Sequence, residues 1–443
     1  SYSTPYRVVG GLLRLVSILG AASQAVQSNF RDVIPTIRKY CKPHARKNVD
    51  LTIAKEFALH SIRKQFNIDK LNPFHFNQAV SYILNESNSL TTSPGITFRK
   101  RGYKTKRDVL TDPVAVGQIH SMLHAVKNYK RRYFPKVYAC VVKAKEILGK
   151  IKARVAFVMP IQVLVPEAMF AAPFLSRLPA DWVPHPRTHH WLCGRYSKSF
   201  DFSSFDASVP RWLIHEGFDV LWSMIEPKQY QDYGIPTGLS QLFDYIRDVY
   251  TNTHTVLPDK SEIVLQNGIP SGGMLTNILD TIISRIVCFE IHAPNCKSRE
   301  IRPTYVRDNI ITYGDDCHVR HCSCSDSYLV ERAKDVFGMD LKIEHPNEIG
   351  CLTFCKAECV NGTPFHTGQW YRNVLDTVSS DLRSTVAHCL KYTDPTSDQR
   401  AELDLIIEEE GFRLDKIHER ALPSIFRMLE HMTTASSPTC TNL

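Results

Sequence analysis

The 443-residue sequence lacks the signatures of several common protein classes. It has no GxxxxGK(S/T) phosphate-binding loop and no serine-hydrolase nucleophile elbow, which argues against a P-loop NTPase and an α/β-hydrolase. It also has no uninterrupted apolar run of about 18 residues, the length that a membrane-spanning helix needs. The most apolar stretch, Val8 to Val26, is interrupted by Arg14. We therefore expect a buried or docking helix there and no membrane partner.

Cysteine pairs with a recognisable spacing are also absent. The 13 cysteines are an odd number at irregular intervals, and we see no secretory leader. This usage predicts a reduced, intracellular compartment. A Cys/His group lies between Cys317 and Cys359, but it contains no CxxC pair. We interpret these cysteines as small buried hydrophobes and keep a zinc site as the less favoured alternative.

Acidic residues are fewer than basic ones, 45 Asp and Glu against 54 Lys and Arg. The net charge of +9 and the isoelectric point near 8.8 favour a polyanionic partner. The hydrophobic share of 43% and the aromatic share of 10% suffice for a substantial core and argue against wholesale disorder. The length fits one large multi-lobed enzyme or about three ordinary domains.

The most informative stretch is Thr312-Tyr313-Gly314-Asp315-Asp316-Cys317. Apolar β-branched residues flank it on both sides, which predicts a strand, a tight turn and a returning strand. Two adjacent carboxylates at a turn repel each other unless a cation shares them. Their oxygen atoms suit Mg²⁺ or Mn²⁺, the ions that assist phosphoryl transfer. The alternative is a solvated Gly-Asp turn.

A further carboxylate candidate lies upstream, in the segment Lys198 to Asp206. A strand would deliver Asp201 at its end, and a helix should begin near Pro210. Asp201 is therefore a candidate third carboxylate for a two-metal site. Asp206 lies past the turn and could accept a hydrogen bond from a sugar hydroxyl, although a helix-capping or loop role is the simpler interpretation.

A small-residue loop, Gly268 to Gly273, precedes an apolar helix predicted from Met274 to Phe289. Such a flexible loop, which includes Ser271 and Gly272, allows close approach to a sugar-phosphate. Thr276, Asn277 and Asp280 are polar on this otherwise apolar segment. Polar residues there need partners, which are either one another or a bound ribose.

Two basic segments precede these motifs. Lys150, Lys152 and Arg154 alternate along a predicted strand and could line a channel that clamps triphosphate oxygens, although an amphipathic edge strand would look similar. The turn Ser93-Pro94-Gly95 introduces the run 98–107, in which six cations and interleaved aromatics suit a nucleic-acid backbone and its bases. A solvated basic loop is the alternative. Near the other end of the motif series, Asp340 to Pro346 alternates as a strand that carries Lys342.

In this order, the motifs strongly resemble the palm of viral RNA-dependent RNA polymerases, from about Thr91 to Lys356. Within that group, the runs Asp201 to Pro210 and Gly268 to Asp280 are most similar to partitiviruses and picobirnaviruses, which are small double-stranded RNA viruses. Pro166-Glu167-Ala168-Met169-Phe170-Ala171 fits the same group. Asp280 departs from the Asn of many positive-strand virus polymerases, whereas double-stranded RNA virus relatives often have Asp there.

The resemblance implies a role for each candidate residue. Asp201 and Asp315, with Asp316 beside them, would bind two Mg²⁺ or Mn²⁺ ions, and Lys342 would protonate the pyrophosphate leaving group. The residues implied for the nucleotide are Lys150, Lys152 and Arg154 at the triphosphate, Asp206, Ser271 and Thr276 at the ribose 2′-hydroxyl, and Asn277 and Asp280 beside them. The residues implied for the template are Ser93, Pro94, Gly95, Arg99, Lys100, Arg101 and Gly272.

We therefore expect an α+β right-hand polymerase with fingers, palm and thumb, whose antiparallel palm sheet carries Asp201 and Asp315 on adjacent strands. The expected limits are 1–196 for the N-terminal region and fingers, 197–223 for palm, 224–268 for a fingers insertion, 269–375 for palm, and 376–443 for the thumb and tail.

The expected function is template-directed RNA synthesis in the transcription and replication of a double-stranded RNA virus genome. The expected partners are the RNA template and product, nucleoside triphosphates and viral capsid protein, inside the virion in the host cytoplasm. A reverse transcriptase and a non-catalytic RNA-packaging or capsid-associated protein are the alternatives. The packaging protein would explain the charge but not three carboxylates in polymerase order.

Overall fold

The computed structural model describes residues 24–26, 33–147, 150–182, 197–292, 309–320, 322, 324–346, 357–360, 363–366, 401, 404–405 and 408. The longer elements confirm the mixed helix-and-sheet composition expected from the sequence. The helices are α2 (Val33–Tyr40), α3 (Thr52–Phe66), α4 (Phe76–Glu86), α5 (Ile96–Lys100), α6 (Lys106–Leu110), α7 (Pro113–Tyr129), α8 (Ile161–Leu175), α9 (Phe205–Ser208), α10 (Arg211–Trp222), α11 (Leu239–Thr251), α12 (Thr276–His292) and α14 (Asp326–Phe337).

A four-stranded antiparallel sheet contains both acidic motifs. Its strands β4 (Ser197–Phe202), β7 (Ile310–Tyr313), β8 (Asp316–Arg320) and β9 (Leu341–Glu344) lie in the order β7-β8-β4-β9. Helix α12 packs on β7 and β8, and α14 packs on β9. The antiparallel sheet backed by helices is therefore confirmed.

A second sheet carries the basic strand. Strands β2 (Val137–Ile147) and β3 (Lys150–Val158) form a long hairpin, and β1 (Gln24–Val26) pairs with the outer part of β2. Strand β5 (Thr253–Val256) runs parallel to β2 and continues into β6 (Glu262–Leu265). Part of the predicted 224–268 insertion thus joins the same sheet as β3, while the domain limits themselves stay a prediction.

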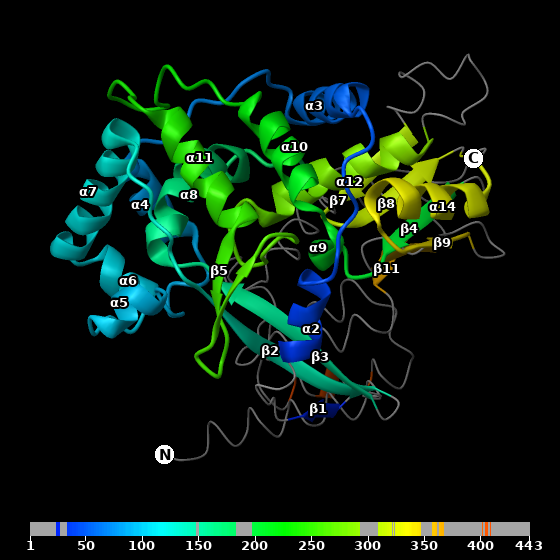
Figure 1. The fold of residues 1–443 in the computed structure, drawn as a ribbon, viewed down its shortest axis with the longest axis horizontal. Coiled ribbons are helices and arrows are strands. Elements are labelled where there is room, and N and C mark those ends of the chain that lie inside the picture. The colour runs from blue at the N-terminus through cyan, green and yellow to red at the C-terminus, as the bar shows by residue number, and fades with distance from the viewer. Residues whose placement is uncertain are drawn as a thin grey trace.

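Helices α8 and α12 form the centre of the molecule. In α8 every residue from Ile161 to Phe174 is buried, and in α12 every residue from Ile278 to His292 is buried. Such helices, apolar on most sides, belong to the core of a large protein. In Figure 1 α12 lies between the four-stranded sheet and the helices α4, α7 and α11, while β2 and β3 extend below them.

Local sequence signals placed most of these elements correctly. The helices expected near Pro210 and after Gly273 are α10 and α12. Gly338, in the left-handed conformation, caps the end of α14. The apolar spacing from Leu51 to Phe66 predicts a helix with Ile53 on its inner face, and α3 forms there, but Ile53 is 60% exposed. The first turn of this helix instead buries Ala54, one position further along.

Several expectations fall at the ends of the chain. Of the helix expected over Val8 to Val26, the described residues Gln24–Val26 form strand β1, so that expectation is wrong at its end. Almost all of the expected thumb, 376–443, lies outside the described residues. A further hairpin joins β10 (Ala357–Val360) to β11 (Thr363–His366). Within the described parts, no helix is long and apolar enough to cross a membrane.

Arg285 connects three elements inside the core. Its side chain is 2% exposed, and burial lowers the pKa of its guanidinium to about 10, so it stays charged at neutral pH. Nε donates to Thr312 Oγ1 at 3.0 Å, Nη1 to Ser61 Oγ at 2.6 Å and Nη2 to Gln65 Oε1 at 2.7 Å. It thereby ties α12 to β7 and α3.

We expect Arg285→Met to lower the free energy of unfolding by about 3 kcal/mol, because three buried or half-buried acceptors would lose a charged donor. Urea denaturation measures the loss. The exposed Arg99→Met is the matched control and should change stability little. Equal stability of both variants would mean that water satisfies the three acceptors.

Candidate active site

The acidic turn joins β7 to β8. Tyr313 pairs with Asp316, so Gly314 and Asp315 form the two-residue tip of the hairpin. Asp315 and Asp316 are exposed, whereas Thr312 and Cys317 on either side are buried. The predicted strand, turn and strand are confirmed: Asp315 lies in the turn, and Asp316 begins β8.

Side chains of α12 hold this turn from behind. The Gly314 N–H donates to Thr281 Oγ1 at 2.9 Å, and Ser284 Oγ donates to the Gly314 carbonyl at 2.7 Å. Thr312 Oγ1 in turn donates to the Thr281 carbonyl at 2.9 Å. Both polar groups of Gly314 are therefore fixed by one helix. The sequence analysis missed Thr281 and Ser284, although polar residues on an apolar helix were the signal that could have found them.

Strand β4 brings Asp201 to the same edge. Phe200 pairs with Cys317 on β8, so Asp201 and Asp316 both lie one residue beyond that pair. Asp201 is exposed, like the two acids of the turn. The structure thus brings together all three carboxylates proposed from the sequence.

These acids repel one another. The pKa of Asp315 is raised to about 6, first by burial among surrounding protein atoms and then by the negative charges of Asp316, Asp206 and Asp201. In the described residues, no three His, Cys, Asp or Glu side chains converge into a ready-made metal cage. Mg²⁺ is commonly held by one or two carboxylates together with substrate phosphates and water. The exposed oxygen donors and their mutual repulsion fit such an ion.

Lys342 lies directly across from Asp201. The two residues are paired in the antiparallel register of β4 and β9, and paired residues project to the same face of a sheet. Lys342 is exposed. The alternation of its strand predicted its exposure, whereas its position beside Asp201 depends on a register that only the folded sheet defines.

Asp206 and Asp280 form a carboxyl pair beside the turn. Asp206 is half-buried in α9, Asp280 is 6% exposed on α12, and their side chains are hydrogen-bonded to each other. Burial raises the pKa of both, and the negative charge of Asp206 raises that of Asp280 further, while Arg154 opposes the rise at Asp206. Two carboxyls bond in this way only through a proton, so Asp280 is the protonated donor. A neutral donor is also what an Asn would supply at this position.

The glycine-rich loop lies against the basic strand. Gly272 has φ of +97°, and a Cβ on it would lie 2.2 Å from the Phe157 carbonyl oxygen. Close approach at this glycine is therefore to β3, and the approach of a sugar-phosphate to the loop stays a prediction. Thr276 Oγ1 donates to the Pro270 carbonyl at 3.1 Å, and Asn277 Oδ1 accepts from Trp182 Nε1 at 3.3 Å.

The basic strand reaches the acidic site through Arg154. Arg154 is exposed and close enough to Asp206 to lower the pKa of that carboxyl. Lys150 and Lys152 alternate with it along the backbone of β3, and their side chains lie outside the described part of the chain. Ser271 is half-buried in the loop beside this strand.

Part of the segment that was expected to guide the RNA template packs into the protein. Pro94 accepts a hydrogen bond from Ile161 N at 2.9 Å, and Gly95 begins α5. Phe98 is 3% exposed, and the Tyr103 hydroxyl is hydrogen-bonded to Asp112. Phe98 therefore belongs to the core and is not available to stack on a base, whereas a contact of the half-buried Tyr103 with bases stays a prediction. Five of the six cations in this run are exposed, whereas Lys106 is buried, and Arg101 donates to Gln118. The exposed cations are Arg99, Lys100, Arg101, Lys104 and Arg107.

The Cys/His group behaves largely as core. Cys317, His318 and Cys324 are buried, and Cys322 Sγ lies 3.3 Å from Nε2 of His292. No cluster of three metal ligands occurs among the side chains that the structure describes. The side chains of His321, Cys351, Cys355 and Cys359 lie outside that set.

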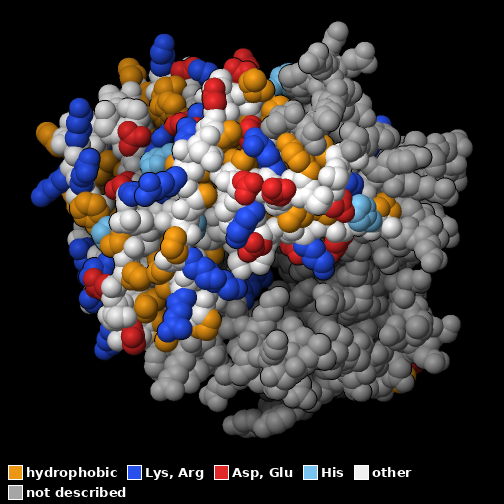
Figure 2. Space-filling view, turned by 45° about the vertical axis from the view of Figure 1, so that its right-hand side comes forward, with side chains coloured by type: hydrophobic (Ala, Val, Ile, Leu, Met, Phe, Trp, Pro, Cys, Tyr) orange, Lys and Arg blue, Asp and Glu red, His pale blue; other side chains and the backbone are white. Residues whose placement is uncertain are grey.

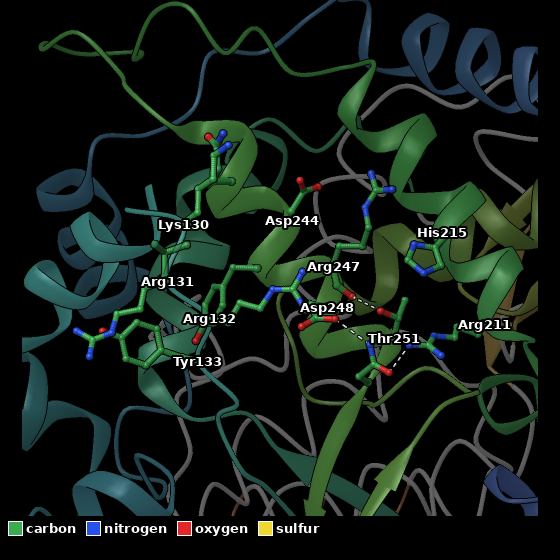
Figure 3. A pocket seen from close by; sticks show the side chains of 14 residues that line it. Lys130, Arg131, Arg132, Tyr133, Arg211, His215, Asp244, Arg247, Asp248 and Thr251 are labelled. Carbon is green, nitrogen blue, oxygen red and sulfur yellow. Dashed lines mark hydrogen bonds between the residues drawn. The ribbon is translucent and has the colours of Figure 1, made fainter. Parts of the chain in front are cut away.

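A basic concavity lies elsewhere in the described part of the chain. A pocket of about 370 Å³ between the end of α7 and helices α10 and α11 is lined by Lys130, Arg131, Arg132, Arg211 and Arg247, among others (Figure 3). Arg247 is paired with Asp219 at 2.8 Å. None of the site residues expected from the sequence lines this pocket. Figure 2 shows further Lys and Arg side chains over much of the described face, with acids among them.

We expect Asp280→Asn to stabilise the protein above about pH 4. The carboxyl has a higher pKa in the folded than in the unfolded chain, so the stability that its proton contributes is lost as pH rises through the folded pKa, at up to about 1.4 kcal/mol per pH unit. Asn keeps the donor to Asp206 and does not titrate.

Urea denaturation without divalent metal at pH 5, 6, 7 and 8 measures this effect. The advantage of Asp280→Asn over the parent should grow with pH, and the exposed Asp335→Asn on α14 should show no such trend. Asp206, Arg154 and Asp315 are the charged groups that act on Asp280 or its partner, and they are present in all three proteins. Parallel curves would contradict the protonated pair.

Comparisons with known proteins agree with this geometry. The family described as "Viral RNA-dependent RNA polymerase" matches residues 16–379. The chain is 26% identical over 277 residues to the "Genome polyprotein" of Ljunganvirus 1, covering 57% of this chain and 11% of the polyprotein. It is 36% identical over 88 residues to the "RNA-directed RNA polymerase" of Cryptosporidium parvum virus 1 (strain KSU-1), covering 20% of this chain and 15% of that protein.

The chain therefore spans little more than a tenth of the length of these curated relatives. A solved structure, "Sicinivirus 3Dpol RNA dependent RNA polymerase", matches with a TM-score of 0.64 at 15% identity and covers 95% of both chains. This likeness confirms the right-hand polymerase fold expected from the sequence. Because the family match extends over most of the chain, this protein belongs to the viral RNA-dependent RNA polymerase family.

Proposed function

We propose that this chain carries out template-directed RNA synthesis by transferring nucleotides to the 3′-hydroxyl of a growing strand. The observation that carries the proposal is the meeting of Asp201, Asp315 and Asp316 at one edge of an antiparallel sheet, in a chain that belongs to the polymerase family. A solvated turn would not require a second acidic strand beside it. The excess of cations and the basic pocket of Figure 3 suit contact with the RNA phosphate backbone.

In the proposed reaction, the 3′-hydroxyl attacks the α-phosphate of a nucleoside triphosphate, and pyrophosphate leaves. Asp201 and Asp315 would hold two Mg²⁺ or Mn²⁺ ions together with the triphosphate, with Asp316 beside them. Bound ions of this kind activate the hydroxyl and neutralise the charge that develops on the leaving oxygen. Arg154, with Lys150 and Lys152 on the same strand, would hold the triphosphate. Lys342, across from Asp201, would supply a proton to the leaving group.

The carboxyl pair supports a preference for ribonucleotides. Asp206 accepts a hydrogen bond from the protonated Asp280 and retains further lone pairs that could accept a hydrogen bond from a ribose 2′-hydroxyl. Thr276 and Ser271 in the adjoining loop would contact the same sugar, and Asn277 would lie beside it. Asp280 would then act through Asp206 rather than touch the sugar itself.

The proposal that the enzyme comes from a double-stranded RNA virus has less support than the proposed reaction. The support is the partitivirus-like and picobirnavirus-like sequence from Asp201 to Pro210 and from Gly268 to Asp280, together with the match to the Cryptosporidium parvum virus 1 polymerase. In that setting the chain would transcribe and replicate the genome inside the virion, with capsid protein as its partner. Cosedimentation with RNA-filled capsids tests this placement separately from the chemistry.

We expect the protein to extend RNA on a single-stranded RNA template with Mg²⁺ or Mn²⁺, and Asp315→Ala to reduce synthesis to background while binding RNA normally. Incorporation of labelled nucleoside triphosphates measures both. The exposed Asp335→Ala is the matched control and should retain activity. Equal product from the parent and Asp315→Ala would show that the assigned site is wrong, and RNA binding without any product would favour the packaging-protein alternative.

We also expect the parent to prefer nucleoside triphosphates over deoxynucleoside triphosphates. Asp206→Ala should narrow that preference by roughly tenfold, the loss expected for one hydrogen bond to a charged group. Single-nucleotide extension with each substrate measures the ratio of kcat/KM values. A parent that prefers deoxynucleotides would instead support the reverse-transcriptase alternative.

A further inference from the structure

A carboxylate without a cationic partner is buried behind the glycine-rich loop. Glu167 lies on α8 and has no exposed surface. Its Oε2 accepts a hydrogen bond from the Tyr250 hydroxyl at 2.8 Å, and its Oε1 accepts from Leu275 N at 3.2 Å and from Met274 N. Among the described residues these three donors, rather than a Lys or Arg, are its partners.

Packing alone does not account for this residue. The remainder of α8 is almost wholly apolar, and burying a carboxylate costs several kcal/mol more than burying an apolar side chain. Burial accordingly raises the pKa of Glu167 to about 7, although hydrogen bonds from Tyr250, Met274 and Leu275 lower it in part. The cost of burying Glu167 must therefore be offset by the effect of its hydrogen bonds on the three groups that donate to it.

Two of the donors are backbone groups at the start of α12. Met274 and Leu275 immediately precede Thr276, the first residue of that helix, and a carboxylate is favourable at a helix N-terminus. Gly273 lies against the same pair: a Cβ on it would lie 1.9 Å from Tyr250 Oη and 3.1 Å from Glu167 Oε2. Glu167 and Tyr250 therefore fill the space behind the loop and leave room there only for glycine.

The same loop carries residues assigned to the sugar, and one of them, Thr276, is hydrogen-bonded through its side chain to the Tyr250 hydroxyl. Gly272 is in close contact with the Phe157 carbonyl, and Thr276 bonds back to Pro270. The loop is thus held between β3 in front and the Glu167–Tyr250 pair behind. Loss of the hydrogen bonds from Met274 and Leu275 to Glu167 would therefore shift the start of α12, and Thr276 with it.

We propose that Glu167, acting with Tyr250, is a positioning residue that sets loop 270–276 in the conformation that discriminates ribose from deoxyribose in the incoming nucleotide. The inference rests on the proposed polymerase function. Neither side chain would touch the substrate. Both would act through the backbone of Met274 and Leu275.

Protonation of Glu167 should loosen the loop. When Glu167 is protonated, one of its oxygens carries a hydrogen that points toward partners that are themselves donors. Fewer of the three donors then keep a hydrogen bond to Glu167. Tyr250 is the titratable group that the described residues bring against it, and burial keeps the pKa of Tyr250 well above its usual value. Sugar discrimination by the parent should therefore decline as pH falls through about 7.

The test compares Glu167→Gln and Tyr250→Phe with Glu290→Gln. Glu290 is 8% exposed on α12 far from the loop, where it pairs with Arg332 at 3.2 Å, so it controls for loss of a buried glutamate. We expect both test variants to lower the ratio of kcat/KM for nucleoside over deoxynucleoside triphosphates by about tenfold. We also expect Glu167→Gln to weaken the dependence of this ratio on pH between 6 and 8, the remainder coming from Asp206 and Asp280, whose pKa values are also raised. Glu290→Gln should lower stability but leave the ratio and its pH dependence unchanged.

Hydrogen exchange of the backbone amides in 271–276 supplies a readout that needs no activity. Faster exchange there in Glu167→Gln than in Glu290→Gln, at matched stability, supports the inference. Unchanged loop exchange, or an unchanged sugar ratio in an active enzyme, overturns it. If the parent makes no RNA at all, the proposed function fails on its own, while the exchange result still decides whether Glu167 positions the loop.

Discussion

The hydrogen bonds between α12 and the Gly314 peptide are the constraint on which the rest of the site depends. Thr281 and Ser284 hold the N–H and the carbonyl of the residue that immediately precedes Asp315. Arg285, next along the helix, fixes β7 to α12 through Thr312. Because the start of the same helix adjoins the sugar-facing loop, α12 places the acids and the loop relative to each other.

The second constraint is electrostatic. Asp201, Asp206, Asp280, Asp315 and Asp316 gather at one end of a sheet, and this concentration of acids is unfavourable in the protein alone. Asp280 is neutralised by a proton through which it is hydrogen-bonded to Asp206, and burial together with the neighbouring acids raises the pKa of Asp315. A folded protein tolerates such local conflict where function requires it, and the extensively buried helices α8 and α12 supply the compensating stability.

Local patterns were sufficient to predict the strands, the acidic turn and the helices after Pro210 and Gly273, because alternation and turn chemistry are encoded within a few residues. The pairing of Asp201 with Lys342 was not predictable, because it depends on register between strands that are far apart in the chain. Phe98 was misjudged because an aromatic beside cations can equally well belong to the core. The roles of Glu167, Thr281 and Ser284 could not be predicted, because their hydrogen-bond partners are distant in the sequence and meet them only in the folded protein.

The most direct test of this account is the rate of RNA synthesis by the double variant Thr281→Val, Ser284→Ala, measured per folded molecule. The control is Thr253→Val, which removes a buried threonine hydroxyl that bonds only to Val249 among the described residues. If α12 positions the acids through Gly314, kcat should fall strongly in the double variant, while RNA binding persists and the control stays active. Unchanged kcat in a folded double variant would contradict the account.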